Sequence, residues 1–110
     1  MTINEYQNKA LRTDSAITDK ERIINGVLGL CGESGECADI VKKHLFQGHD
    51  LDAEHLAKEL GDVAWYIATT SYAIGYDLET ILRMNVDKLQ KRYPKGFETK
   101  RSKVREREDI

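Results

Sequence analysis

The fold of this chain is decided by residues 53–74, which read AEHLAKELGDVAWYIATTSYAI. Apolar side chains recur in this stretch every three or four residues, the spacing that puts them on one face of an α-helix: Leu56, Leu60, Val63, Ala64 and Ile67. A turn-rich segment around Gly48 precedes the stretch, and Gly75 follows it as a suitable C-terminal cap. Residues 53–74 are therefore predicted to form one amphipathic helix.

Three other segments show the same helical periodicity. Residues 2–11 and residues 18–46 each begin with a Thr-x-x-Glu capping box, which satisfies the free amides at the start of a helix. The fourth segment begins with Asp77 as its N-cap and ends before Pro94. In residues 18–46 the apolar side chains predicted to share one face are Ile24, Val27, Leu28, Cys31, Ala38 and Leu45. Short connections and the lack of an alternating strand pattern predict an all-α fold, an antiparallel four-helix bundle.

Length and charge limit the organisation of the chain. Its 110 residues are enough for one core, which is expected to be a domain of residues 1–97. Residues 98–110 are dominated by charge and are predicted to be a flexible tail without a catalytic role. Because such a short chain buries a limited fraction of its surface, a second copy is expected to cover its apolar helix faces. The prediction is a homodimer or a homotetramer.

Composition also excludes several classes of partner. The 17 basic and 19 acidic residues give a net charge of -2, so no overall attraction to nucleic acid or to an anionic membrane is expected. No apolar run approaches the roughly 18 residues that a membrane span needs. Cys31 and Cys37 form neither a CxxC motif nor a Cys/His array, and no signal peptide is visible. These features predict a cytoplasmic protein with reduced thiols.

Four carboxylates occupy two of the predicted helices at matching spacing. Glu33 and Glu36 are three residues apart in one helix, and Glu59 and Asp62 repeat this spacing in the next. Four converging carboxylates would repel one another at neutral pH unless divalent cations neutralised them. Oxygen ligands favour Mg²⁺, for which Mn²⁺ can substitute, and Mg²⁺ typically bridges to substrate phosphates. The same spacing is common on solvated helix faces, and that alternative stays open.

Glycines surround the first carboxylate pair, at Gly29, Gly32 and Gly35. Inside a helix each glycine costs up to about 1 kcal/mol relative to alanine, so three of them need a structural reason. Close approach of a second helix or of a ligand is one reason. A break in the helix near Gly32 is the alternative.

A basic strip is predicted on the fourth helix. Asn85, Lys88 and Arg92 lie near one side of it, and Tyr93 follows. Arginine can hold a phosphate with two N–H groups and lysine adds a point charge, which favours a site for anions. An ordinary solvated basic face is the alternative. Trp65 is predicted to stack on a nucleotide base, although aromatic residues on helices commonly pack in the core.

These motifs resemble those of the MazG-like nucleotide pyrophosphohydrolases. That family's signature is ExxE followed further along the chain by ExxD, which here reads Glu33-Ser-Gly-Glu36 and Glu59-Leu-Gly-Asp62. The flanking text, LGLCGESGECADIVKK and LAKELGDVAWYIA, resembles the family's two metal-binding helices. The text NVDKLQKRYPKGF resembles its substrate-side helix and closing turn. The resemblance covers residues 3–97.

The resemblance implies a Mg²⁺-dependent enzyme that cleaves nucleoside triphosphates to the monophosphate and pyrophosphate. It implies metal ligands and phosphate or sugar contacts, namely Glu33, Glu36, Glu59 and Asp62 for the metal, and Asn85, Lys88 and Arg92, with Tyr93 nearby, for the substrate. Glu36 is the carboxylate expected to activate the water. The expected substrates are dNTPs or non-canonical NTPs. Two alternatives stay open: a phosphoribosyl-ATP pyrophosphohydrolase, and a non-catalytic helical adaptor that binds a protein partner.

Overall fold

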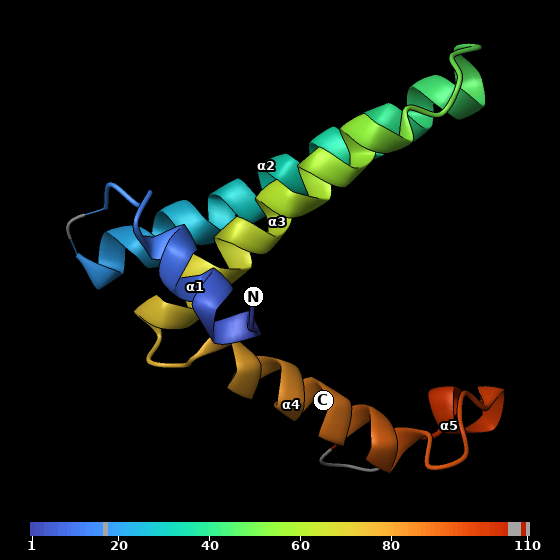
Figure 1. The fold of residues 1–110 in the computed structure, drawn as a ribbon. Coiled ribbons are helices and arrows are strands. Elements are labelled where there is room, and N and C mark those ends of the chain that lie inside the picture. The colour runs from blue at the N-terminus through green and yellow to red at the C-terminus, as the bar shows by residue number, and fades with distance from the viewer. Residues whose placement is uncertain (17, 106–108, 110) are drawn as a thin grey trace. The chain divides into compact units, whose positions relative to one another are not determined.

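The computed structural model describes residues 1–16, 18–105 and 109, and these residues form helices and loops without a β-strand (Figure 1). The helices are α1 (Ile3–Leu11), α2 (Asp19–Phe46), α3 (Ala53–Ala73), α4 (Leu78–Arg92) and α5 (Thr99–Lys103). Thr2 and Thr18 accept hydrogen bonds from the backbone N–H of Glu5 and Glu21, as the capping boxes predict. The predicted all-α fold is confirmed.

The long helices α2 and α3 run antiparallel, side by side (Figure 1). Two glycines allow their backbones to approach. A Cβ atom added to Gly26 would lie 1.8 Å from the hydroxyl oxygen of Thr70, and one added to Gly29 would lie 2.1 Å from a ring carbon of Tyr66. Both distances are far below van der Waals contact, so any side chain at these positions would force its neighbour on α3 to shift.

The helix α2 continues without a break through Gly32 and Gly35. A Cβ atom added to either glycine would have no neighbour within 4 Å. Close helix approach therefore explains Gly29, whereas Gly32 and Gly35 lie on the open side of α2. The alternative, a break in the helix near Gly32, does not occur.

The apolar stripe that was predicted to be the buried face of α2 is largely exposed. Ile24 keeps 51% of its surface exposed, Leu28 keeps 68% and Leu45 keeps 63%. The side of α2 that meets α3 instead carries Gly26, Gly29 and, further along, the buried Ile40. The sequence pattern correctly marks an apolar face, but α3 does not cover it.

The buried centre lies where α1 crosses α3. Ala10 and Ala68 pack there with Leu78, and Tyr6, Trp65 and Ile67 surround them. The buried side chain of Gln7 ties α1 to the end of α3: its amide N–H₂ donates to the carbonyls of Ala68 and Tyr76, at 3.1 and 3.2 Å, and its carbonyl accepts from the N–H of Leu78 at 3.0 Å. This set of bonds fixes α1 on α3.

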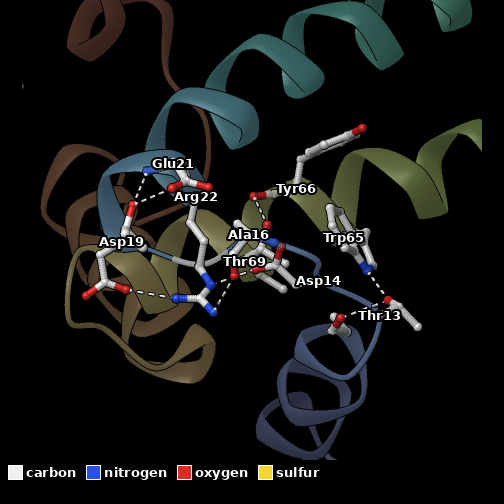
Figure 2. Close-up of polar contacts among 12 residues, drawn as sticks. Thr13, Asp14, Ala16, Asp19, Glu21, Arg22, Trp65, Tyr66 and Thr69 are labelled. Atoms are coloured by element: carbon white, nitrogen blue, oxygen red, sulfur yellow. Dashed lines mark hydrogen bonds and ion pairs between the residues drawn. The ribbon is translucent and has the colours of Figure 1, made fainter.

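An ion pair holds the connection between α1 and α2 (Figure 2). The guanidinium of Arg22 donates to Asp14 at 2.7 Å and to Asp19 at 3.1 Å, and it also reaches the carbonyl of Ala16. The side chain of Asp14 is only 3% exposed, so this carboxylate depends on its charged partner. The start of α2 is thereby anchored.

The chain divides into two compact units, residues 1–78 and residues 79–110. The first unit contains α1, α2 and α3, and the second contains α5 and all of α4 after its first residue. The domain boundary expected at residue 97 stays a prediction. None of the helices in the described ranges combines the length and the apolar character that crossing a bilayer demands.

Candidate active site

Three of the four predicted carboxylates converge between α2 and α3. One oxygen from each of Glu33, Glu59 and Asp62 lies within 4.8 Å of the other two. Glu33 comes from α2, while Glu59 and Asp62 lie one helical turn apart on α3. The i, i+3 spacing thus brings two side chains of α3 to one point, and the antiparallel partner supplies the third.

The cluster changes the acidity of Glu33. A hydrogen bond with Glu59, partial burial, and the negative charges of Glu59, Asp62 and Glu36 raise the pKa of Glu33 from 4.5 to about 7. Protonation relieves the repulsion when no cation is near, and a divalent cation would relieve it more completely. The cluster therefore has the electrostatic character of a cation site.

Glu36 belongs to this negative field but not to the converging group. It lies one turn beyond Glu33 on α2, and its side chain is exposed. Among the described residues, the group whose oxygens lie within 4.8 Å consists of the other three carboxylates. The roles predicted for Glu36 as a metal ligand and as the catalytic base stay predictions.

Aromatic side chains form the wall beside the acidic cluster. A hollow of about 340 Å³ is lined by Glu33, Asp62, Trp65 and Tyr66. The two aromatic rings meet edge to face with their centroids 5.0 Å apart, and the indole N–H of Trp65 donates to the hydroxyl of Thr13 at 2.8 Å (Figure 2). Trp65, predicted to contact the base, therefore lies beside the acidic cluster in a held orientation.

Two neighbours of the cluster were not predicted as site residues. His55 contacts Glu59 at 3.2 Å, and the i, i+4 spacing of the two residues is a signal that could have revealed this pair. Tyr6, on α1, is the second neighbour of the cluster. Burial, the larger cause, and the charge of Asp62, the smaller one, both raise the pKa of its hydroxyl. Nothing in the sequence around Tyr6 indicates that α1 reaches the acidic cluster.

The basic strip lies in the second unit. Lys88 and Arg92 line one pocket there, formed by α4 and the C-terminal segment. Asn85 is exposed on α4, and the ring of Tyr93 lies under the guanidinium of Arg92, 5.9 Å from its central carbon. The acidic cluster and the basic pocket thus belong to different units.

The donor set of the cluster suits a hard cation. All three converging groups are carboxylates, the ligand type that Mg²⁺ and Mn²⁺ prefer over nitrogen or sulfur. Mg²⁺ keeps several water molecules and binds through few protein ligands together with phosphate oxygens. Three carboxylates on an open helix surface meet that requirement.

Comparison with known proteins points to the same chemistry. The family model of the MazG nucleotide pyrophosphohydrolase domain matches residues 24–97. The Gene 37 protein of Mycobacterium phage L5 is 38% identical over 73 residues, 63% of this chain, and the match spans 64% of the length of that relative. No solved structure matches the chain significantly. The family match contains both acidic motifs and the basic end of α4, and the chain belongs to the MazG nucleotide pyrophosphohydrolase domain family.

Proposed function

We propose that this protein hydrolyses nucleoside triphosphates between the α and β phosphates, releasing the monophosphate and pyrophosphate. The observation that carries the proposal is the convergence of Glu33, Glu59 and Asp62 beside the aromatic wall of Trp65 and Tyr66. A carboxylate cluster calls for a cation, and an adjacent aromatic surface suits a nucleotide base. Membership of the MazG family supports the same reaction.

In this proposal the four carboxylates Glu33, Glu36, Glu59 and Asp62 hold Mg²⁺. The cation, when bound, polarises the phosphoryl group and lowers the pKa of water. Glu36 accepts the proton of the attacking water, which suits its exposed position beside the cluster. His55, at 3.2 Å from Glu59, orients that carboxylate.

The proposed substrate contacts are aromatic, basic and polar side chains. Trp65 stacks on the base, and its bond to Thr13 keeps the indole in one orientation. Lys88 and Arg92 bind phosphate oxygens, and Asn85 and Tyr93 complete the contacts of that helix. We propose dNTPs or non-canonical NTPs as the substrate class, with phosphoribosyl-ATP as the substrate to be tested against them.

We also propose that the active form contains two or more copies of the chain. The apolar stripe of α2 remains uncovered, with Ile24, Leu28 and Leu45 at 51–68% exposure. Burying such side chains is worth about 1.5–3 kcal/mol each, which favours association through this face. Sedimentation measurements on wild type and on Leu28→Glu test this: the charged side chain should shift the protein to a smaller species.

The proposed reaction is tested by incubating the purified protein with a panel of NTPs and dNTPs, and with phosphoribosyl-ATP, in the presence of Mg²⁺. Pyrophosphate and the monophosphate are measured together. We expect both products in equal amounts from at least one nucleotide. Turnover of phosphoribosyl-ATP above every NTP would change the substrate class while leaving the bond that is cleaved.

Variants of α3 separate catalysis from folding. Asp62→Asn removes one carboxylate of the cluster and should lower activity by at least about 100-fold, since even outer-shell partners of metal ligands contribute about 10 to 100-fold. Glu54→Gln is the matched control, because Glu54 lies on the same helix, is 84% exposed and pairs with Lys58. Equal activity of Asp62→Asn and wild type would contradict the role of the carboxylate cluster, whereas a folded wild type that releases no product from any nucleotide would favour the helical adaptor.

A further inference from the structure

A second pocket, with a volume of about 410 Å³, lies within residues 79–110 between α4 and the C-terminal segment. Five basic side chains and two carboxylates line it, so its charge is positive. The basic residues come from both sides of the pocket: Lys88, Lys91 and Arg92 from α4, and Arg101 and Arg105 from the C-terminal segment. Such a pocket is suited to an anion with several negative oxygens.

One anion already occupies this pocket, and it belongs to the chain itself. The guanidinium of Arg92 donates two parallel hydrogen bonds to the carboxylate of Asp109, both 2.6 Å long. Both side chains are only 11% exposed. The hydrogen bonds from Arg92 and the positive charges of Arg92, Arg105 and Lys88 hold the pKa of Asp109 below its usual range. Asp109 is thus bound as an anionic ligand.

The planar fork of an arginine accepts a carboxylate or a phosphate in the same two-point geometry. A carboxylate supplies two oxygens and a single charge, whereas a phosphate group supplies more of both. Four other basic side chains line the same pocket without making this two-point contact: Lys88, Lys91, Arg101 and Arg105. A larger anion can reach them. The carboxylate of Asp109 therefore takes the two-point position in which a phosphate group would fit.

We propose that this pocket binds phosphate groups, that Arg101 and Arg105 extend it beyond α4, and that Asp109 is an internal competitor which the phosphate must displace. The identification of the ligand as a nucleotide polyphosphate rests on the proposed function. The anion site and its competitor rest only on the geometry within residues 79–110. A tethered carboxylate competes at a high effective concentration, so it weakens the apparent affinity for phosphate.

The test measures inorganic pyrophosphate binding by calorimetry, at fixed ionic strength and with EDTA present. Chelation removes divalent cations, so the carboxylate cluster of the first unit does not contribute. Asp109→Asn should bind pyrophosphate about fivefold to tenfold more tightly than wild type, because the competitor has lost its charge. Asp87→Asn is the matched control: it removes the same charge from the same pocket but not the carboxylate that Arg92 holds.

Equal affinities for Asp109→Asn and wild type would overturn the proposal, as would an equal gain for Asp87→Asn. Circular dichroism at 222 nm checks that both variants keep their helices. In a double-mutant cycle with Arg92→Lys, the gain from Asp109→Asn should disappear, since lysine cannot hold the carboxylate at two points. A gain that persists in the Arg92→Lys background would place the effect of Asp109 elsewhere and refute the competition.

The hydrolysis assay separates this proposal from the proposed function. If both are correct, Asp109→Asn lowers KM for the nucleotide by about the same factor and leaves kcat unchanged. Hydrolysis with an unaltered KM would refute the competitor while the enzyme stands. Tighter pyrophosphate binding by Asp109→Asn in a protein that hydrolyses no nucleotide would refute the enzyme while the anion site stands.

Discussion

Replacing a glycine of α2 with alanine should have opposite effects on stability at the position that meets α3, Gly29, and at the open position, Gly32. Gly29→Ala would put a methyl group 2.1 Å from a ring carbon of Tyr66, and Gly32→Ala would put one where nothing lies within 4 Å. Carbon atoms in contact prefer about 3.5–4.0 Å, so the ring must move by about 1.5 Å. Tyr66 packs against Trp65, which limits that movement.

The magnitudes follow from these distances. Overpacking a helix interface destabilises the folded state by about 1–3 kcal/mol, and replacing glycine by alanine within a helix stabilises it by about 0.5–1 kcal/mol. Gly29→Ala should therefore destabilise the protein by about 1–2 kcal/mol. Gly32→Ala should stabilise it by about 0.5–1 kcal/mol, because only the helix preference changes. In a domain of this size, about 1 kcal/mol corresponds to about 4–8 °C in Tm.

Urea unfolding followed by circular dichroism at 222 nm measures both free energies of unfolding. The fluorescence of Trp65, the single tryptophan, reports on the contact with Tyr66 in the same samples. It should change in Gly29→Ala and stay constant in Gly32→Ala. If both variants shifted in the same direction by similar amounts, the close approach of α2 and α3 at Gly29 would be wrong.

Three further predictions concern the site and its support. In metal-free protein, the raised pKa of Glu33 contributes stability that is fully present below pH 4.5 and is lost as the pH rises through about 7. Thermal unfolding across this pH range in EDTA should show this loss in wild type and not in Glu33→Gln. Gln7→Ala removes three hydrogen bonds to backbone groups and should cost about 2–3 kcal/mol in urea unfolding, whereas the exposed Gln90→Ala should cost almost nothing. Trp65→Ala should raise KM for the nucleotide about tenfold by removing base stacking; an unchanged KM would place the base elsewhere.

Helix positions follow from the sequence because capping and periodicity are local. The boxes at Thr2 and Thr18 begin α1 and α2, and the pattern of residues 53–74 forms α3. The convergence of Glu33 with Glu59 also follows, since the i, i+3 motif restricts each helix to one side. These inferences need only the geometry of a single helix.

Contacts between helices are not encoded in this local way. The apolar stripe of α2 predicts a buried face, yet Leu28 is 68% exposed, and Gly26 and Gly29 meet α3 instead. Hydrophobic periodicity marks an apolar face of a helix but does not say which element packs on it. The pairing of Arg92 with Asp109, across 17 residues, has no spacing rule that could reveal it.

The register of the α2–α3 pair links the glycines to the acidic cluster. Gly26 faces Thr70 and Gly29 faces Tyr66, so each step forward along α2 is matched by a step back along α3. One turn further along the same line, Glu33 meets Asp62. Since Gly29 brings the backbones together within one turn of that meeting point, it holds the carboxylates of the two helices close enough to share a cation. A substitution that separates the helices at Gly29 should therefore weaken Mg²⁺ binding as well as stability, although it removes no ligand.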